Sequence, residues 1–328
     1  MMVVSGHCTL LLILIVCMFL FMINFNSTSV PSTSRNSPFK PNNTIGTRRF
    51  YVASNPAPAV TAAFEDWRQC VIKQLDKKKS DPKLWKKFAA IVVECTASTE
   101  LSKIIITPIR NKDEIKRYIY NNDTTNPAVV VTLGVGEDII AETHLKKTLP
   151  LGSKFFGADP VWEKNADLFA QVGKFFPIAV GKETGYIATD ILTKGRYQSS
   201  NVMTIDFVTF LTKMVNESMI DLILMDNEGA EYDIVQLLTV DKVFDKHGIV
   251  VCQMNAEFHP PRNGQSYIDY LKIMLDTIKA GRFAPIFVLN EKNTWQRAFL
   301  VNYSNHRCRR KYLDQFFRKT SNTSRYYS

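Results

Sequence analysis

Between residues 126 and 304, short runs of β-branched and aromatic residues alternate with longer amphipathic stretches. This pattern predicts an α/β fold of three layers, in which a central sheet has helices on both faces. The last two runs are joined only by residues 290–295, too few for a crossover helix, so we expect an antiparallel hairpin on an otherwise parallel sheet. The seven predicted strands are residues 129–133, 154–158, 176–180, 222–225, 249–254, 283–289 and 296–301.

Two amphipathic stretches precede the sheet, at residues 61–79 and 82–97, with Ser80-Asp81-Pro82 between them. They predict a helical hairpin. We therefore divide the chain after residue 60 into an N-terminal helical segment (61–125), a sheet domain (126–304) and a basic C-terminal tail (305–328).

The cysteines bear on the cellular compartment. Four of the six lie outside the N-terminal apolar run, and they allow three pairings. Cys70 and Cys95 lie on the two helices of the hairpin, which can bring their thiols together. A disulfide there would fit an oxidising lumen, and two buried free thiols are the alternative. There is no Cys-x-x-Cys motif or Cys/His cluster, so we expect no structural zinc site.

The N-terminal segment is strongly apolar. Residues 9–25 carry no charge and approach the length of about 20 apolar residues that spans a bilayer as a helix. Segment 1–25 is therefore predicted to be a signal anchor, with a cleaved signal peptide as the alternative. Residues 26–60 are rich in Ser, Thr, Pro and Asn and predict a disordered stem. This layout predicts a single-pass membrane protein with its domain in the ER or Golgi lumen, or a secreted protein if the apolar segment is removed.

Asn-x-Ser/Thr sequences predict a lumenal glycoprotein. We expect Asn122 to be the most accessible acceptor, because it lies in a turn-rich run before the first strand. The six acceptor sites are Asn26, Asn42, Asn122, Asn216, Asn302 and Asn322.

Charge excludes one class of partner. The net charge is +10, but the basic excess lies in the two terminal segments and in the helical residues 61–87, and residues 88–304 hold 26 acidic against 22 basic residues. Such a block does not form the basic groove that follows phosphates, so we expect no nucleic-acid partner. A composition of 45% hydrophobic and 22% charged residues also excludes collagen-like, coiled-coil and wholly disordered proteins.

Two loops of the sheet domain carry a possible binding signal. The first strand runs into Gly134-Val135-Gly136, where the backbone can approach a ligand and a helix N-terminus follows. The second strand ends at Asp159, an acid placed to accept hydrogen bonds from both hydroxyls of an adenosine ribose. A dinucleotide site would have a third glycine where this chain has Ile139, so the loop fits a cofactor with adenosine but no pyrophosphate. The alternatives are a plain tight turn for the glycines and a helix cap for Asp159.

The densest acid cluster follows the fourth strand. Asp226 and Glu228 lie just past its carboxyl end, where open α/β sheets bind their ligands. They are placed to orient a substrate hydroxyl, accept its proton or bind a divalent metal. Alternatively, Glu228 and Glu231 only complement the N-terminus of the next helix. His259 follows the fifth strand, which we place beside the fourth, and is a candidate base.

In chain order these segments resemble the FkbM-type branch of the S-adenosylmethionine-dependent methyltransferases, in the form found in membrane-anchored animal proteins. The resemblance covers residues 60–304, and DNEGAE is its most specific part. The resembling segments are VVVTLGVGEDI, FFGADP, FPIAVGKETG, MTIDFVTFL, IDLILMDNEGAEYDIV and VVCQMNAEFH.

The resemblance implies a Rossmann-like methyltransferase sheet and the cofactor S-adenosylmethionine. It places Gly134 and Gly136 at the methionine end of the cofactor, Asp159 at its ribose, and Asp226 and Glu228 at the site of methyl transfer. Such enzymes commonly carry an acid at the end of the first strand.

This chain departs from that pattern, because it has Thr132 there. The function we expect is O-methylation of a glycan, lipid or small-molecule hydroxyl in the secretory pathway, with membrane contact through the N-terminal helix. Two other functions are compatible with the sequence. One is a lumenal glycosyltransferase with Asp226 and Glu228 as a degenerate metal site, and the other is an inactive relative that only binds a partner. The sequence does not determine the oligomeric state.

Overall fold

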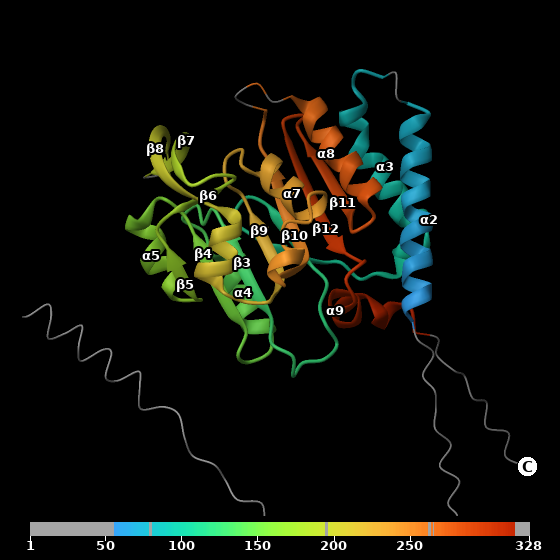
Figure 1. Ribbon diagram of the computed structural model, residues 1–328, viewed down its shortest axis with the longest axis horizontal. Coiled ribbons are helices and arrows are strands. Elements are labelled where there is room, and N and C mark those ends of the chain that lie inside the picture. The colour runs from blue at the N-terminus through green and yellow to red at the C-terminus, as the bar shows by residue number, and fades with distance from the viewer. Residues whose placement is uncertain (1–55, 79–80, 194–195, 262–263, 265, 319–328) are drawn as a thin grey trace, which may run out of the picture. The chain divides into compact units, whose positions relative to one another are not determined.

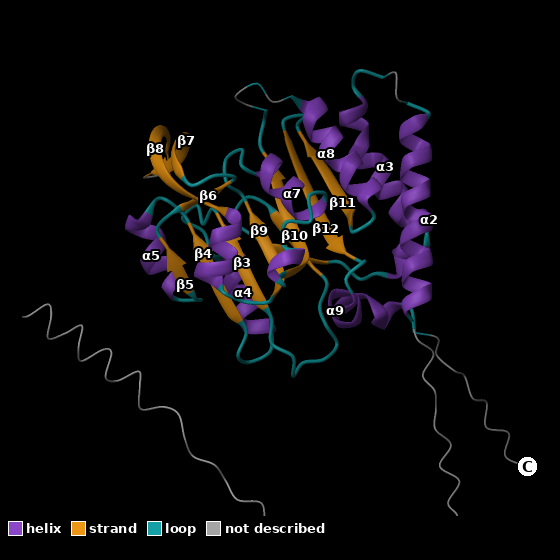
Figure 2. Ribbon diagram, in the orientation of Figure 1, coloured by secondary structure: helices purple, strands orange, loops and turns teal. Residues whose placement is uncertain are grey.

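A seven-stranded sheet forms the centre of the fold (Figures 1 and 2). The computed structural model describes residues 56–78, 81–193, 196–261, 264 and 266–318. The strands follow one another in the order β11-β12-β10-β9-β3-β4-β5, and β12 runs antiparallel to both of its neighbours. The strands are β3 (Val129–Leu133), β4 (Lys154–Ala158), β5 (Lys174–Phe176), β9 (Met219–Met225), β10 (Val250–Phe258), β11 (Phe283–Glu291) and β12 (Trp295–Asn302).

The apolar runs form inner strands because both faces of the sheet are covered. Every residue of β9 after Met219 is buried, as is every residue of β10 after Val250. Parallel strands covered on both faces are expected to be almost continuously apolar, as β9 is. Strand β10 also carries the buried polar residues Gln253, Asn255 and Glu257. The predicted α/β sheet, the placing of β10 beside β9 and the terminal hairpin are confirmed.

Helices connect the strands. Helices α7 and α8 pack against each other, with α7 against β10 and α8 against β11. Ser266 begins α8 with a capping box, because its side chain accepts from the Asp269 amide while Asp269 accepts from Ser266. The connecting elements are α4 (Ile140–Thr148), α5 (Trp162–Ala170), α6 (Phe207–Thr209), η2 (Phe210–Val215), α7 (Glu231–Thr239), η3 (Asp245–His247) and α8 (Tyr267–Ala280).

The predicted helical hairpin consists of α2 (Ala57–Asp76) and α3 (Leu84–Ser98), followed by the short η1 (Glu100–Lys103). Helix α3 packs against β11, so the hairpin covers that end of the sheet (Figure 1). The predicted disulfide between Cys70 and Cys95 is present, with a Cα–Cα distance of 5.8 Å. Helix α2 begins within the last residues assigned to the stem, which therefore ends earlier than predicted.

The third strand differs from the prediction of 176–180. Strand β5 ends at Phe176. The next strand, β6 (Ala179–Gly181), belongs to a separate sheet. Pro177 separates the two strands, and a proline has no N–H with which to continue a ladder.

Two hairpins were not predicted from the sequence. Strands β1 (Thr107–Arg110) and β2 (Ile115–Tyr118) pair within the segment predicted to be helical. Strands β7 (Gly185–Thr193) and β8 (Arg196–Asp206) form a long hairpin, and β8 also pairs with β6. The β7–β8 hairpin stands beyond the carboxyl edge of the central sheet (Figure 1).

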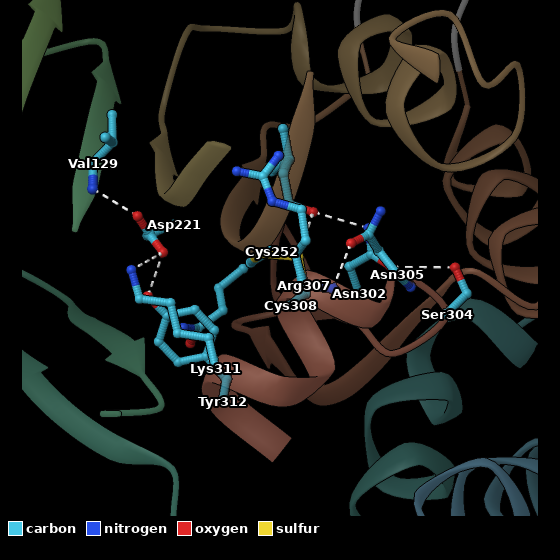
Figure 3. Close-up of a disulfide and its surroundings, with 12 residues drawn as sticks. Val129, Asp221, Cys252, Asn302, Ser304, Asn305, Arg307, Cys308, Lys311 and Tyr312 are labelled. Atoms are coloured by element: carbon cyan, nitrogen blue, oxygen red, sulfur yellow. Dashed lines mark hydrogen bonds and ion pairs between the residues drawn. A yellow bond between two sulfur atoms is a disulfide. The ribbon is translucent and has the colours of Figure 1, made fainter. Parts of the chain in front are cut away.

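The first part of the predicted basic tail is packed on the domain. It forms α9 (His306–Cys308), η4 (Arg309–Leu313) and η5 (Asp314–Phe316), and a second disulfide joins Cys252 of β10 to Cys308. Tyr312 and Lys311 both contact Asp221 of β9, at 2.5 Å and 2.8 Å, as Figure 3 shows. Residues 305–317 are thus part of the folded domain rather than a tail.

Accessibility divides the predicted glycosylation sites. Asn122 and Asn216 are exposed. Asn302 is 3% exposed and donates to the Val251 carbonyl, so it is not accessible to modification in the folded protein. Asn26, Asn42 and Asn322 lie outside the described residues.

The described part of the chain contains no helix long and apolar enough to span a membrane. The predicted anchor (1–25) and the stem up to residue 55 lie outside it.

Candidate active site

A cavity opens at the carboxyl ends of β3, β4 and β9. Strand β3 lies between β4 and β9, so the direction of strand order reverses at this point, where α/β sheets bind their ligands. The cavity is lined by five of the six site residues predicted from the sequence: Gly134, Gly136, Asp159, Asp226 and Glu228. His259 is not among the lining residues.

Gly134 and Gly136 are required for different structural reasons. Gly134 has φ +80°, and a Cβ there would lie 1.8 Å from the backbone oxygen of Asp226, so packing between two loops requires it. Gly136 has φ +59°, and a Cβ there would meet nothing within 4 Å. The loop therefore leaves open space above Gly136, which suits the close approach of a ligand.

Asp159 holds the glycine loop. It is 7% exposed; one carboxylate oxygen accepts from the amides of Val135 (2.8 Å) and Gly136 (3.1 Å), and the other accepts from Val161 (2.8 Å). Burial raises the pKa of this carboxyl, against the effect of the backbone amides. The contact with Val161 fits the alternative in which Asp159 is a helix cap. The contacts with the glycine loop show that Asp159 also positions this loop, which the sequence did not indicate.

The loop after β9 is held in an unusual conformation. Glu228 has φ +55°, which is uncommon outside glycine, and Gly229 follows at φ +113°. Glu231 is fully buried at the start of α7 and accepts from the amides of Asn227 and Gly229, both at 2.8 Å. Glu231 thus fixes the loop that presents Asp226 and Glu228 to the cavity. Strained backbone of this kind is typical of functional sites.

His259 lies behind these acids and bridges them. Its Nδ1 is 3.1 Å from Glu231 Oε1, and its Nε2 is 3.4 Å from Asp226 Oδ1 and 3.5 Å from Glu228 Oε2. Burial opposes a charge on the ring, but the three carboxylates outweigh it and raise the pKa of His259 well above 6.5. The three carboxylates therefore favour the imidazolium form, which has no free site for a proton. This charge state argues against the role of base expected from the sequence.

Asp226 is the better candidate for a base. Burial raises the pKa of its carboxyl from 3.8 to about 6, although Lys116 and His259 act in the opposite direction. A carboxylate with a pKa near 6 accepts a proton more readily than an ordinary aspartate and is still ionised at neutral pH.

The β1–β2 hairpin supplies lining residues that sequence reasoning missed. Lys116 of β2 is 6% exposed and pairs with Glu114. Burial disfavours its charge, but Glu114 and Asp226 outweigh this and raise the pKa of Lys116. A lysine in the sequence IKRY gives no signal of this location, because the hairpin reaches the cavity only through the tertiary fold.

Carboxylates also gather around Asp226 in two groups whose ligand atoms lie within 4.8 Å of one another. One group is Asp226, Glu231 and His259, and the other is Glu114, Asp226 and Glu257. Protein cations offset part of their charge. His259 lies within the first group, and Lys116 and Arg297 pair with members of the second.

This geometry agrees with the comparison to known families. The family model described as "Methyltransferase FkbM domain" matches residues 78–283. The chain belongs to this FkbM-domain family. S-adenosylmethionine is the cofactor that the family implies.

Individual relatives are more distant. An uncharacterized protein of Caenorhabditis elegans, C28H8.7, is 27% identical over 171 residues, which are 46% of this chain and 58% of that protein. This FkbM-domain chain thus matches little more than half the length of that relative.

Among solved structures, a human methyltransferase 10 domain containing protein is 9% identical, with a TM-score of 0.33 over 56% of this chain and 76% of that one. A SAM-dependent methyltransferase from Aquifex aeolicus is 12% identical, with a TM-score of 0.29 over 55% and 84%.

The FkbM-domain site fits an adenosyl cofactor that carries an amino acid. The open space above Gly136 suits the close approach of a ligand to the loop, and Asp159 lies at the end of the adjacent strand β4. One buried carboxylate oxygen of Glu142, a residue of the cavity wall, has no hydrogen-bond partner in the described part of the chain, and it is a candidate acceptor for a cationic group.

Proposed function

We propose that this FkbM-domain protein is an S-adenosylmethionine-dependent O-methyltransferase whose acceptor is a hydroxyl group. The observation that supports it most is the position of Asp226, which lies at the same cavity as the glycine loop and has a pKa of about 6. The cavity thus combines a place for the cofactor with a candidate base for the acceptor.

Each residue has a distinct part in this proposal. Gly134 and Gly136 shape the loop against the methionine end of the cofactor, and Asp159 fixes that loop while facing the ribose. Asp226 accepts the acceptor hydroxyl's proton, and Glu228 orients the acceptor. When bound, S-adenosylmethionine supplies an activated methyl group that passes to the acceptor oxygen and leaves S-adenosylhomocysteine. Most of the rate enhancement in such a transfer comes from positioning the two reactants in line.

The imidazolium of His259 has a positioning role in this scheme. It contacts Asp226 and Glu228, and its charge favours the ionised form of Asp226. Ile187 and Ile191 of β7 also line the cavity, which gives the acceptor side an apolar wall. A glycan, a lipid or a small molecule with a hydroxyl next to apolar surface is the acceptor class we infer.

We place this activity in the secretory pathway. Two disulfides within the described residues and an exposed Asn122 support a lumenal domain, since disulfides persist in oxidising compartments. Membrane attachment through residues 1–25 is part of the same proposal and rests on the sequence alone.

The test is calorimetric titration of the full-length protein with S-adenosylmethionine and, separately, with a UDP-sugar in the presence of Mn²⁺. Binding of S-adenosylmethionine without binding of the UDP-sugar supports the methyltransferase. The reverse result would favour a glycosyltransferase that uses Asp226 and Glu228 for its metal, and binding of neither would favour a non-catalytic partner-binding protein.

A further inference from the structure

Glu142 is a buried acid with one oxygen unused. It lies in the first turn of α4 and is 3% exposed. Its Oε1 accepts a hydrogen bond from Thr132 Oγ1 at 2.6 Å, whereas its Oε2 is buried and has no hydrogen-bond partner among the residues that the structure describes. An unpaired buried carboxylate oxygen is costly, and a ligand that donates a hydrogen bond to it would relieve this cost.

The position of this carboxylate connects it with the glycine loop. Thr132 lies on β3, two residues before Gly134, and both Thr132 and Glu142 line the cavity. Thr132 occupies the position, near the end of the first strand, at which the family resemblance predicts an acid. Its hydroxyl instead fixes a carboxylate that comes from the following helix.

Two other acids of the cavity wall, Asp138 and Asp159, already have partners. Asp138 accepts from the Lys112 amide with one oxygen and from the Ile140 amide with the other, both at 2.9 Å. Both oxygens of Asp159 accept backbone amides, as described above. Lys116 is paired with Glu114. Burial raises the pKa of Glu142, although Thr132 and Lys116 act in the opposite direction, and a cation beside Oε2 would further favour the ionised form.

We propose that Glu142 binds the α-ammonium group of the cofactor's methionine part, in place of the missing strand acid. The inference rests on the proposed function and deepens it. An ammonium offers three N–H donors, and it can give one to Glu142 Oε2 while Oε1 stays bonded to Thr132. The contact is a charge-assisted hydrogen bond inside a buried pocket.

Comparing two ligands isolates the contact between Glu142 and the α-ammonium group from the other contacts of the cofactor. S-adenosylhomocysteine carries the amino acid part, whereas 5′-methylthioadenosine keeps the adenosine and the thioether but has no ammonium. In the full-length protein, Glu142→Gln should weaken S-adenosylhomocysteine binding by about tenfold to a hundredfold, measured by calorimetry. Its affinity for 5′-methylthioadenosine should stay within about twofold of wild type.

Asp138→Asn is the matched control, because it removes the same charge from the same cavity wall. Both of its oxygens are occupied by the protein, so any loss should be the same for both ligands. If circular dichroism shows that Glu142→Gln does not fold, Thr132→Val is the second variant. It keeps the carboxylate but removes the hydroxyl that positions it, and it should also weaken S-adenosylhomocysteine selectively.

The outcomes distinguish this inference from the proposed function. Equal losses for both ligands in Glu142→Gln, or no loss, would overturn the role of Glu142 and leave the methyltransferase proposal intact. Equal affinity of the wild-type protein for the two ligands would do the same, because it would show that the ammonium is not recognised. If the wild-type protein bound neither ligand, the proposed function and the inference would both be wrong.

Discussion

Replacing Asp159 by alanine tests whether this residue both holds the glycine loop and binds the cofactor. The substitution leaves three backbone amides without their acceptor, those of Val135, Gly136 and Val161. An amide that loses its partner costs about 1–3 kcal/mol when buried and less when water replaces the acceptor. Because the cavity admits water to part of this loop, we expect the free energy of unfolding to fall by about 3 kcal/mol, the lower end of the sum.

The same variant should bind the cofactor more weakly. Loss of a charge-assisted contact to the ribose lowers affinity by about tenfold to a hundredfold. Both S-adenosylhomocysteine and 5′-methylthioadenosine contain the ribose, so Asp159→Ala should weaken both to the same extent. This pattern differs from that of Glu142→Gln, which should affect only the ligand with an ammonium.

Two measurements check the prediction. Urea unfolding followed by circular dichroism should show a midpoint lower by roughly 1 M, at an m value of about 3 kcal/mol/M. Calorimetry gives the two affinities. Asp167→Ala is the control, because Asp167 is exposed on α5, and it should change stability by less than about 0.5 kcal/mol.

The loop-holding role and the ribose-binding role of Asp159 can be refuted separately. An unchanged unfolding midpoint would refute the loop-holding role. A midpoint that falls while both affinities stay at the wild-type value would show that Asp159 only caps the chain and does not contact the ribose.

Four further predictions concern catalysis, stability and the cellular compartment. Asp226→Asn should reduce turnover by at least about tenfold with little change in cofactor affinity. The rate of the wild-type enzyme should rise with pH through about 6, as the base ionises. A pH profile that is the same in both proteins would exclude Asp226 as the base. Because folding raises this pKa above 3.8, the folded state binds the proton more tightly, and the contribution of Asp226 to stability should fall as pH rises from about 4 to 6. Replacing both Cys252 and Cys308 by alanine should lower the free energy of unfolding by about 4 kcal/mol, since the disulfide closes a separation of 56 residues; an unchanged urea midpoint would contradict this. Enzymatic deglycosylation of the cell-derived protein should lower its apparent mass, and Asn122→Gln should remove part of that difference; no change in mass would argue for a cytosolic domain.

Local pattern was enough to determine the framework of the fold. Strands 129–133 and 154–158 were predicted with the bounds that the structure has, because strands covered on both faces are short continuous apolar runs. The antiparallel β11–β12 hairpin was predicted from the short connection between its two strands. The disulfide between Cys70 and Cys95 followed from two adjacent helices. Each of these features depends on residues that are close in the sequence.

The sequence also indicated five of the residues that line the cavity. Because the carboxyl ends of parallel strands meet at one edge of a sheet, residues that follow different strands converge there. Gly136 and Asp159 reach the cavity from β3 and β4, and Asp226 reaches it from β9.

Only the tertiary structure decided how these side chains are used. It places Glu142 against Thr132, brings Lys116 from a distant hairpin to the wall of the cavity, and surrounds His259 with carboxylates that keep it charged. It also joins Cys308 to β10, which turns a predicted basic tail into part of the core. Periodicity reports which face of an element is buried, but the partner of a buried polar group is set by contacts between elements far apart in the chain. The charge state and the free hydrogen-bonding capacity of the site depend on those partners, and these two properties assign the residues their chemistry.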